Sequence, residues 1–196
     1  MAAEFLPAYN ITRQNEGGYH NATGVNSADR GGETFKGIAR KAWPGWLGWK
    51  IIDAMKIGPG FPQVALEDET LSKLVRGFYQ RHFWDINRLT EISNQAIANE
   101  LFDTGVNVGS VTAARWLQRA CNYLNRNQRS WPNLKVDGMI GPITLSRVNA
   151  LSAVDQRHLF DVLNIMQGMH YINIIDRDPS QEVFLRGWIS RVELIR

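Results

Sequence analysis

The sequence has little cysteine, no long apolar run and almost no excess of charge. Cys121 is the only cysteine among 196 residues, so no disulfide can form within the chain. Nowhere do 18 apolar residues follow one another, as a membrane-spanning helix would require. The 22 basic residues barely outnumber the 19 acidic ones, and neither half carries a basic block. We therefore expect neither membrane insertion nor a nucleic-acid partner.

The N-terminal residues, "MAAEFLPAYNITRQ", lack the basic segment and apolar run of a secretory signal peptide. We expect synthesis in the cytoplasm without a signal peptide. Action outside the cytoplasm would then need release by lysis or a separate export route.

No metal site and no cofactor are expected. The four histidines have no spacing typical of metal ligands and no cysteine partners. The segment "GPGFP" lacks the lysine and hydroxyl of a phosphate-binding loop. Cys121 lies on an apolar helical stripe and is most simply a buried filler.

Helical periodicity dominates the chain, and no segment sustains the alternation of a β-sheet. The 44% hydrophobic content suffices for one core or for two closely packed lobes. We predict a mainly α fold with little or no β-sheet. Ser110 is expected to cap one helix and Ser152, with Asp155, another. Helices are predicted over residues 3–15, 49–58, 65–84, 94–109, 111–125, 143–151 and 152–175.

Residues 15–38, "NEGGYHNATGVNSADRGGETFKGI", contain six glycines, three acids and almost nothing apolar. Glu16 follows the first predicted helix, where unpaired carbonyls and nearby apolar groups would favour the protonated carboxyl. Gly17 and Gly18 leave room for a bulky ligand. Glu16 is therefore a candidate general acid, although a solvated acid at a helix end explains the same spacing.

Asp29 and Thr34 are the other candidate catalytic residues in this segment. Asp29 precedes a pair of glycines that permits a tight turn, and Thr34 offers a hydroxyl that could hold a water. One protonated acid, one ionised acid and one water-positioning group match glycoside hydrolysis. Asp29 as a simple turn former remains the alternative.

Several markers resemble, in order, the glycoside hydrolase family 108 lysozymes with their attached peptidoglycan-binding segment. The markers are "EGGY" (16–19), "GGETFKGI" (31–38), "FYQRHFWD" (78–85), "LFDTGVNVG" (101–109), "LQRA" (117–120) and "VDGMIGPIT" (136–144). The resemblance implies a lysozyme-like helical fold that cleaves the bond between N-acetylmuramic acid and N-acetylglucosamine in cell-wall peptidoglycan.

The resemblance also implies roles for individual residues. The family's catalytic glutamate falls on Glu16, whereas Asp29 and Thr34 transfer less directly. Arg30 stands where the family usually has proline, so the turn after Asp29 is set differently. Substrate contact is implied for Tyr19, Asp103 and Asn107. For Asp103 a structural role is the favoured alternative, and helix termination explains Asn107 nearly as well.

Three tryptophans at intervals of three, Trp43, Trp46 and Trp49, could stack on sugar rings, but core packing is the more frequent use of such residues. Trp84 and Tyr79 are likewise assigned to the core. The "VDGMIGPIT" turn could bind cell wall or simply join two helices.

We expect a catalytic region over residues 1–95 and a helical peptidoglycan-binding-like region over residues 96–196. The predicted function is that of a monomeric peptidoglycan hydrolase acting on the periplasmic or extracellular cell wall. The alternative is a non-catalytic module linked to wall binding or secretion, which the altered turn at Arg30 and the "VDGMIGPIT" marker would suit.

Overall fold

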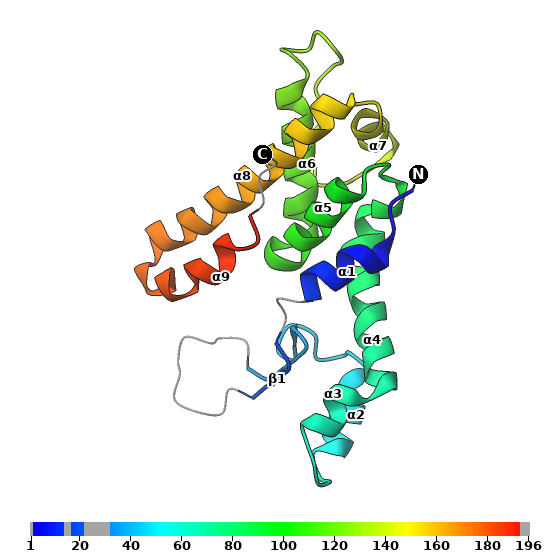
Figure 1. Cartoon of the computed structure of the whole chain (residues 1–196), viewed down its shortest axis with the longest axis vertical. Helices are drawn as coiled ribbons and strands as arrows, with labels where there is room; N and C mark the ends of the chain where they lie inside the picture. Colours follow the sequence, from blue (N-terminus) through cyan, green and yellow to red (C-terminus); the bar gives the residue numbers. More distant parts are fainter. Residues whose placement is uncertain (1, 14–16, 22–31, 193–196) are drawn as a thin grey trace. The chain divides into compact units, whose positions relative to one another are not determined.

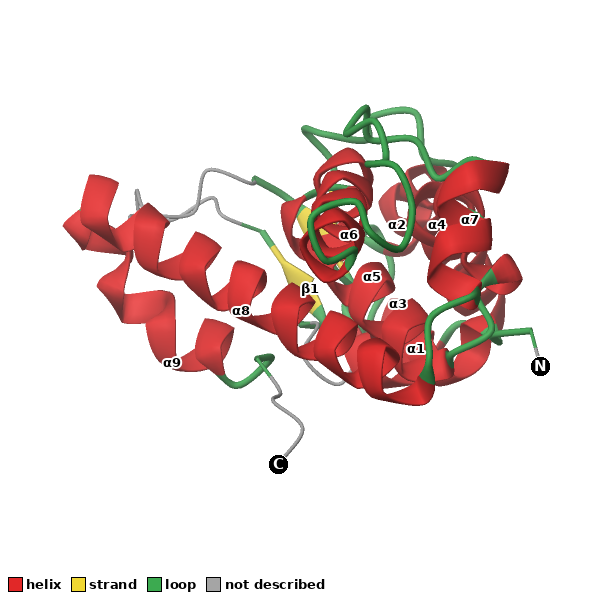
Figure 2. Cartoon of the chain, turned by 90° about the horizontal axis from the view of Figure 1, so that it is seen from above, coloured by secondary structure: helices red, strands yellow, loops and turns green. Residues whose placement is uncertain are grey.

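The computed structural model of the chain describes residues 2–13, 17–21 and 32–192. Within these ranges the chain is mainly helical, as predicted, with one small sheet (Figures 1 and 2). The chain divides into two compact units. One comprises Met1–Tyr9 with His82–Arg196, and the other comprises Asn10–Arg81.

The unit Asn10–Arg81 contains a three-stranded antiparallel sheet and three helices. The strands are β1 (Tyr19–His20), β2 (Thr34–Phe35) and β3 (Ile38–Ala39), in the order β1-β2-β3. Each strand has only two residues, too few to show an alternating pattern in the sequence. The helices are α2 (Gly48–Met55), α3 (Gln63–Glu67) and α4 (Glu69–Tyr79).

The core of this unit lies between the sheet and its helices. Phe35, Ile52 and Leu71 have no exposed surface, and Trp49 is 2% exposed. Asp68 caps α4 by accepting a hydrogen bond from the backbone of Leu71 at 2.7 Å, an arrangement that satisfies an otherwise unpaired donor of the first turn.

The other unit is built from helices alone among its described residues. Helix α1 (Phe5–Arg13) begins in it, and η1 (Gln80–Trp84), η2 (Asp85–Asn87) and η3 (Leu89–Glu91) lead into its main helices. These are α5 (Gln95–Val108), α6 (Ser110–Leu124), α7 (Pro142–Asn149) and α8 (Ala153–Arg177), followed by η4 (Pro179–Phe184) and α9 (Leu185–Ile189).

Helices α5 and α6 form a hairpin, and the long helix α8 packs on both. Figure 1 shows α9 folding back beside the C-terminal half of α8. Leu101, Leu117 and Leu159 are fully buried between these helices. Cys121 is buried too, which confirms its expected place in the core.

The two predicted helix caps have different outcomes. Ser152 caps α8 by accepting a hydrogen bond from the backbone of Asp155 at 3.1 Å, as predicted. The prediction for Ser110 was wrong. Gly109, at φ 97°, precedes α6 without a side-chain cap, and the Ser110 hydroxyl instead donates to the carbonyl of His82 at 2.9 Å.

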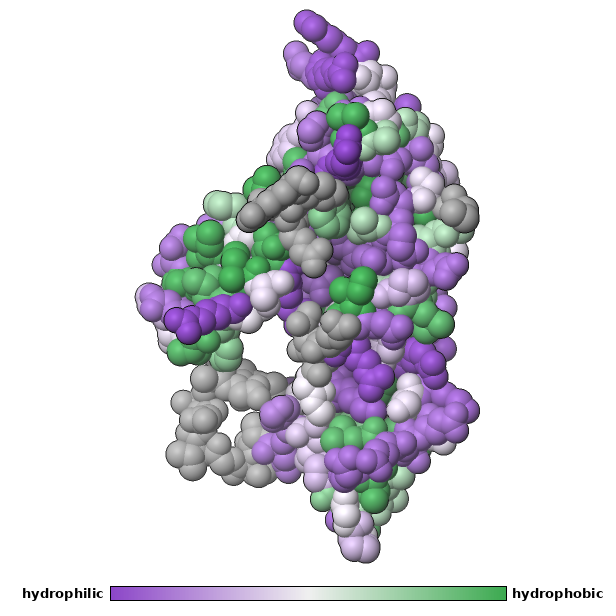
Figure 3. Space-filling view, in the orientation of Figure 1, coloured by the Kyte–Doolittle hydropathy of each residue, from purple (hydrophilic) through white to green (hydrophobic). Residues whose placement is uncertain are grey.

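Apolar residues gather on the surface over α8 and α9 (Figure 3). Among the residues that the structure describes, no helix combines the length and apolarity that crossing a bilayer requires. The exposed large apolar residues of these elements and η4 are Val154, Ile165, Met169, Ile172, Val183, Phe184 and Ile189.

Candidate active site

The small sheet joins the two glycine-rich markers of the N-terminal segment. Tyr19 in β1 pairs with Phe35 in β2, and His20 pairs with Thr34. The backbone N–H of Lys36 donates to the carbonyl of Gly18 at 2.7 Å. The sheet therefore places the end of the "EGGY" marker beside the "GGET" marker, although 14 residues separate Tyr19 from Glu33.

A two-residue turn connects β2 to β3 and sets the position of Lys36. Lys36 and Gly37 have φ values of 44° and 81°, and two positive φ values in succession are typical of the tight turns of β-hairpins. Glycine adopts this conformation freely, whereas a lysine is strained in it. The Tyr79 hydroxyl steadies the turn by donating to the Lys36 carbonyl at 3.0 Å.

Tyr19 is held by its ring and by its hydroxyl. The ring packs edge-on against Phe61 with 4.7 Å between centroids, and the hydroxyl donates to Glu33 Oε1 at 3.1 Å. Burial raises the pKa of Tyr19, and the Glu33 carboxylate raises it further. Tyr19 therefore stays protonated and serves as a hydrogen-bond donor to Glu33.

Glu33 is the centre of a cluster of four charged side chains. Its carboxylate lies 2.6 Å from Lys56 Nζ and 2.7 Å from Arg40 Nη1. Both cations also contact Asp53, Lys56 at 3.1 Å and Arg40 through both of its terminal nitrogens. Two anions and two cations thus connect the residue preceding β2 to helix α2.

The cluster keeps both of its carboxylates ionised. Burial would raise the pKa of Glu33, but hydrogen bonds from Lys56 and Arg40 outweigh it, so the pKa lies below its usual value. The Arg40 hydrogen bonds lower the pKa of Asp53 to about 2. A carboxylate held in this way is a poor proton donor near neutral pH. Glu33 is consequently suited to positioning Tyr19 and β2.

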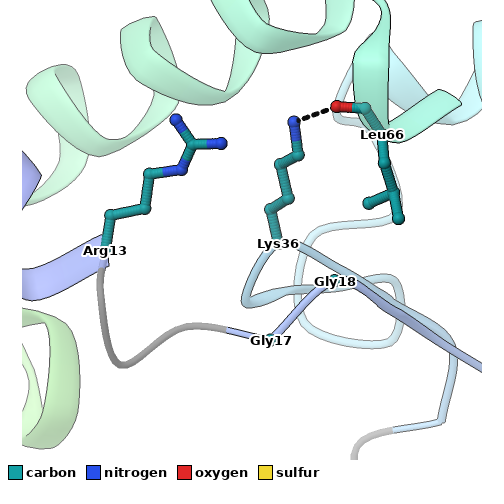
Figure 4. Close-up of a pocket in the computed structure, with 5 residues that line it drawn as sticks. All are labelled: Arg13, Gly17, Gly18, Lys36 and Leu66. Carbon is teal, nitrogen blue, oxygen red and sulfur yellow. Dashed lines mark hydrogen bonds between the residues drawn. The ribbon is translucent and has the colours of Figure 1, made fainter. Parts of the chain in front are cut away.

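A pocket of about 240 Å³ lies next to the two glycines that follow Glu16 in the sequence. It is lined by Arg13, Gly17, Gly18, Lys36 and Leu66. A Cβ on Gly17 would come within 3.2 Å of the His20 ring. Figure 4 shows the Arg13 and Lys36 side chains extending in parallel toward the same side of the pocket.

The Lys36 ammonium forms the inner part of this pocket. It donates to the Leu66 carbonyl at 2.8 Å and to the Ser72 hydroxyl at 3.3 Å, both neutral acceptors. Burial lowers the pKa of Lys36, and the charge of Arg13 lowers it further, against an opposite effect of Asp68. The two neighbouring positive charges repel each other, and in a concave site they attract an anionic group.

The predicted catalytic residues are only partly within the described structure. Glu16 and Asp29 lie outside the described residues. Thr34 is half-buried in β2, where it pairs with His20, and Tyr19 stands on the neighbouring strand. The structure therefore brings together Tyr19 and Thr34. The catalytic roles of Glu16, Asp29 and Thr34 stay predictions.

Asp103 and Asn107 lie one turn apart on α5, in the other unit. Asp103 accepts hydrogen bonds from Arg191 and Gln167, each at 3.1 Å, and from Asn107 at 3.0 Å. The Asn107 amide also donates to the Asp103 carbonyl. These contacts connect α5 to α8 and to the segment after α9, which favours the structural alternative for Asp103. The substrate contacts stay predictions.

The tryptophans at intervals of three mostly pack on one another. Trp49 is buried, and its indole N–H donates to the Trp43 carbonyl at 2.9 Å. The Trp46 and Trp49 rings are 5.3 Å apart, whereas Trp43 is 37% exposed. Trp84 and Tyr79 are buried, which confirms their assignment to the core. Across the described ranges, no three metal-ligating side chains converge.

Sequence reasoning missed the cluster around Glu33. Glu33 belongs to the "GGET" marker, but Arg40, Asp53 and Lys56 are ordinary charged residues between 7 and 23 positions farther along the chain. These three side chains and Glu33 come together only when α2 folds beside the sheet. Lys36 was missed for a similar reason, because in the sequence it looks like an ordinary solvated residue of a turn.

Comparison with known proteins agrees with these markers. The chain resembles the solved structure of SagA from Brucella abortus with a TM-score of 0.58 over 96% of this chain and 88% of that one, at 20% identity. This likeness shows a shared fold. A comparison with curated protein sequences gives no match.

Two family profiles match adjacent parts of the chain. The family described as Predicted Peptidoglycan domain matches residues 112–193. Glycosyl hydrolase 108 matches residues 9–109, more than half of the chain, and includes the sheet, the Glu33 cluster and the pocket beside Gly17. The chain therefore belongs to the Glycosyl hydrolase 108 family and is a glycoside hydrolase that acts on peptidoglycan.

Proposed function

We propose that the protein is an N-acetylmuramidase in which Glu16 acts as the general acid. Glu16 would protonate the oxygen of the bond between N-acetylmuramic acid and N-acetylglucosamine. Asp29 would stabilise the positive charge that develops on the sugar or activate a water, and Thr34 would position that water. The match of the Glycosyl hydrolase 108 family across the segment that carries all three residues supports this assignment.

The arrangement of the described residues around this segment is consistent with the proposal. Gly17, the residue after Glu16, lines a pocket without presenting a side chain. Thr34 is fixed in β2 by its pairing with β1, and β2 is secured to α2 through Glu33. A water-positioning hydroxyl requires such rigid support, because misplacement by about 1 Å can cost a hundredfold in rate.

The charge of the pocket suits a cell-wall substrate. Arg13 and Lys36 present two positive charges beside Gly17. Each N-acetylmuramic acid carries a lactyl group whose carbonyl end is either a free carboxylate or the start of a peptide with carboxylates of its own. We propose that the two cations receive such a group and so favour muramic acid over uncharged sugars.

Digestion of purified sacculi tests the function. The wild-type protein is expected to release reducing ends, with mass spectra showing N-acetylmuramic acid at the newly formed reducing end. The variant Glu16→Gln should lose about a hundredfold to ten-thousandfold of this activity. Glu69→Gln is the matched control, since the Glu69 side chain is 84% exposed on α4. Undiminished activity of Glu16→Gln in a folded protein would refute the assignment.

We further propose that residues 1–95 supply catalysis and residues 96–196 hold the wall, and that the protein works as a monomer. The order of the two family matches supports this division. Because its substrate lies beyond the cytoplasmic membrane, the protein would act in the periplasm or outside the cell. Sedimentation of the active protein at working concentration tests the monomeric state.

A further inference from the structure

A second pocket, of about 540 Å³, lies in the helical unit between α6, α7 and the loop that joins them. Its lining includes Gln118 of α6, Arg147 of α7 and residues from the connecting segment 132–144, whose last three residues form the start of α7. This segment contains the "VDGMIGP" turn, whose role the sequence leaves open.

Two amide side chains of α6 fix the path of the connecting segment. Asn122 donates to the carbonyl of Leu134 at 2.9 Å and accepts from its backbone N–H at 2.7 Å. One turn earlier on the same face, Gln118 donates to the Met139 carbonyl at 3.0 Å and accepts from the Gly138 N–H at 2.9 Å. The segment is therefore held by its backbone.

Because the backbone is secured in this way, apolar side chains of the segment face outward. Met139 and Ile143 line the pocket, yet they are 68% and 70% exposed. Pro132 and Pro142 add further apolar surface. Exposed apolar side chains around a preformed concavity mark binding sites more often than single scattered ones do.

The charged groups of the pocket differ in their hydrogen-bond partners. Asp137 accepts hydrogen bonds from Gln118 at 2.8 Å and from the Met139 N–H at 3.0 Å. Arg147 is half-buried in the lining and has no hydrogen-bond or ion-pair partner within the described part of the chain. Lys135 adds a second positive charge. The pocket thus offers a guanidinium that can still receive a carboxylate.

We infer that this pocket binds the stem peptide of peptidoglycan, with Arg147 receiving a carboxylate and Met139 and Ile143 contacting aliphatic side chains. Stem peptides combine small aliphatic residues with free carboxylates, which matches this lining. A glycan strand fits less well, because sugars are commonly held by aromatic faces and no aromatic residue is among those described around the pocket.

The inference deepens the proposed function, since it assigns a wall-binding site to a peptidoglycan hydrolase. Under this inference, the two halves of the chain bind different parts of one polymer. The catalytic region would engage the glycan, and the α6–α7 pocket would engage the peptide. Sacculi with intact stems should therefore be held more firmly than bare glycan strands.

Sedimentation with sacculi tests the inference, and it uses the full-length protein at low temperature to limit digestion. Ile143→Asp and Arg147→Gln should each weaken binding about tenfold, through loss of apolar contact and of a charge-assisted hydrogen bond. Val183→Asp is the control, because Val183 is 77% exposed on η4, outside the pocket lining. An amidase divides sacculi into soluble glycan strands and soluble stem peptides. Added stem peptides should displace the wild type from intact sacculi, whereas they should displace little of the Ile143→Asp variant, which lacks the peptide contact.

A soluble probe and an activity assay separate the possible outcomes. The tripeptide L-Ala-γ-D-Glu-L-Lys should shift the amide NMR signals of residues 132–147 in the wild type and not in Arg147→Gln. Failure of the stem peptides to displace the wild type, or unchanged binding of both variants, would overturn the inference. Release of reducing ends reports separately on the proposed function: if it is absent from the wild type while peptide-dependent binding persists, only the catalytic assignment fails.

Discussion

Lys56 Nζ lies 2.6 Å from Glu33 Oε1, so the residue that follows α2 is ion-paired with the residue that precedes β2. Glu33 also accepts a hydrogen bond from the hydroxyl of Tyr19 in β1. One carboxylate therefore connects two strands and a helix around the segment that carries the predicted catalytic threonine. The position of Thr34 is therefore supported by the Glu33 carboxylate as well as by the pairing of the short strands.

Glu33→Gln is expected to lower the free energy of unfolding by about 1–3 kcal/mol, because it removes a largely buried acceptor of charge-assisted hydrogen bonds. The Glu33 side chain is 12% exposed. Asp53→Asn is the matched control, with its side chain 47% exposed, and should cost less than about 1 kcal/mol. Urea unfolding at pH 7 measures both, and equal losses would contradict a central role for Glu33.

The same cluster predicts a loss of stability in acid. The pKa of Glu33 lies below its usual value of 4.5 and that of Asp53 falls from 3.8 to about 2. The unfolded chain therefore takes up protons first as the pH falls, and folding loses stability from about pH 5 downward. The melting temperature should drop between pH 5 and pH 2.5 in the wild type and less in the double variant Glu33→Gln/Asp53→Asn. If the melting temperatures of the wild type and the double variant fall in parallel, groups other than Glu33 and Asp53 govern the loss of stability in acid.

Gly138→Ala should destabilise the protein by about 2–4 kcal/mol, since it combines strain with a steric clash. Gly138 has φ 83°, and an added Cβ would lie 2.7 Å from Val111 Cγ1. Gly141→Ala, in the same segment, meets nothing within 4 Å at φ −94° and should cost less than about 1 kcal/mol. Thermal unfolding of the two variants distinguishes a backbone requirement at Gly138 from a general sensitivity of this segment to substitution.

The Asp103–Arg191 ion pair should contribute to stability as a coupled unit. Its side chains are 14% and 11% exposed, with 3.1 Å between charged atoms. A double-mutant cycle with Asp103→Ala and Arg191→Ala is expected to give a coupling energy of about 1–2 kcal/mol.

Sacculus digestion by the same variants separates the two interpretations of Asp103. Under a structural role, Asp103→Ala and Arg191→Ala lose similar activity, in proportion to their loss of stability. A fully folded Asp103→Ala that fails to bind substrate would instead support the predicted substrate contact.

Most of the longer helices of this chain could be predicted because local signals specify them. The single helix predicted over residues 65–84 was wrong, since the chain is divided at Asp68 into α3 and α4. Ser152 precedes Asp155 by three residues, and the cap forms as the pattern indicates. The Ser110 prediction failed because its hydroxyl has a tertiary partner, the His82 carbonyl, which local sequence does not reveal.

Helix α8 shows the same limit on a larger scale. The apolar side chain of Met169 is 50% exposed. Asn164 and Gln167 are fully buried instead. Gln167 donates to Asp103 of α5, so a polar contact between helices sets the rotation of α8. The Glu33 cluster and the pocket around Arg147 were beyond prediction for the same reason, since each is formed by residues distant in the chain.

The hydrogen bonds from Gln118 and Asn122 to main-chain atoms of the connecting segment have an evolutionary consequence. Because the hydrogen bonds from these amides to the main chain do not involve the side chains of Met139 and Ile143, both residues can be exchanged while the connecting segment keeps its course. Preference for a different cross-link or diamino acid can thus change by surface substitution alone, and related enzymes can follow the wall chemistry of new hosts without rebuilding their scaffold.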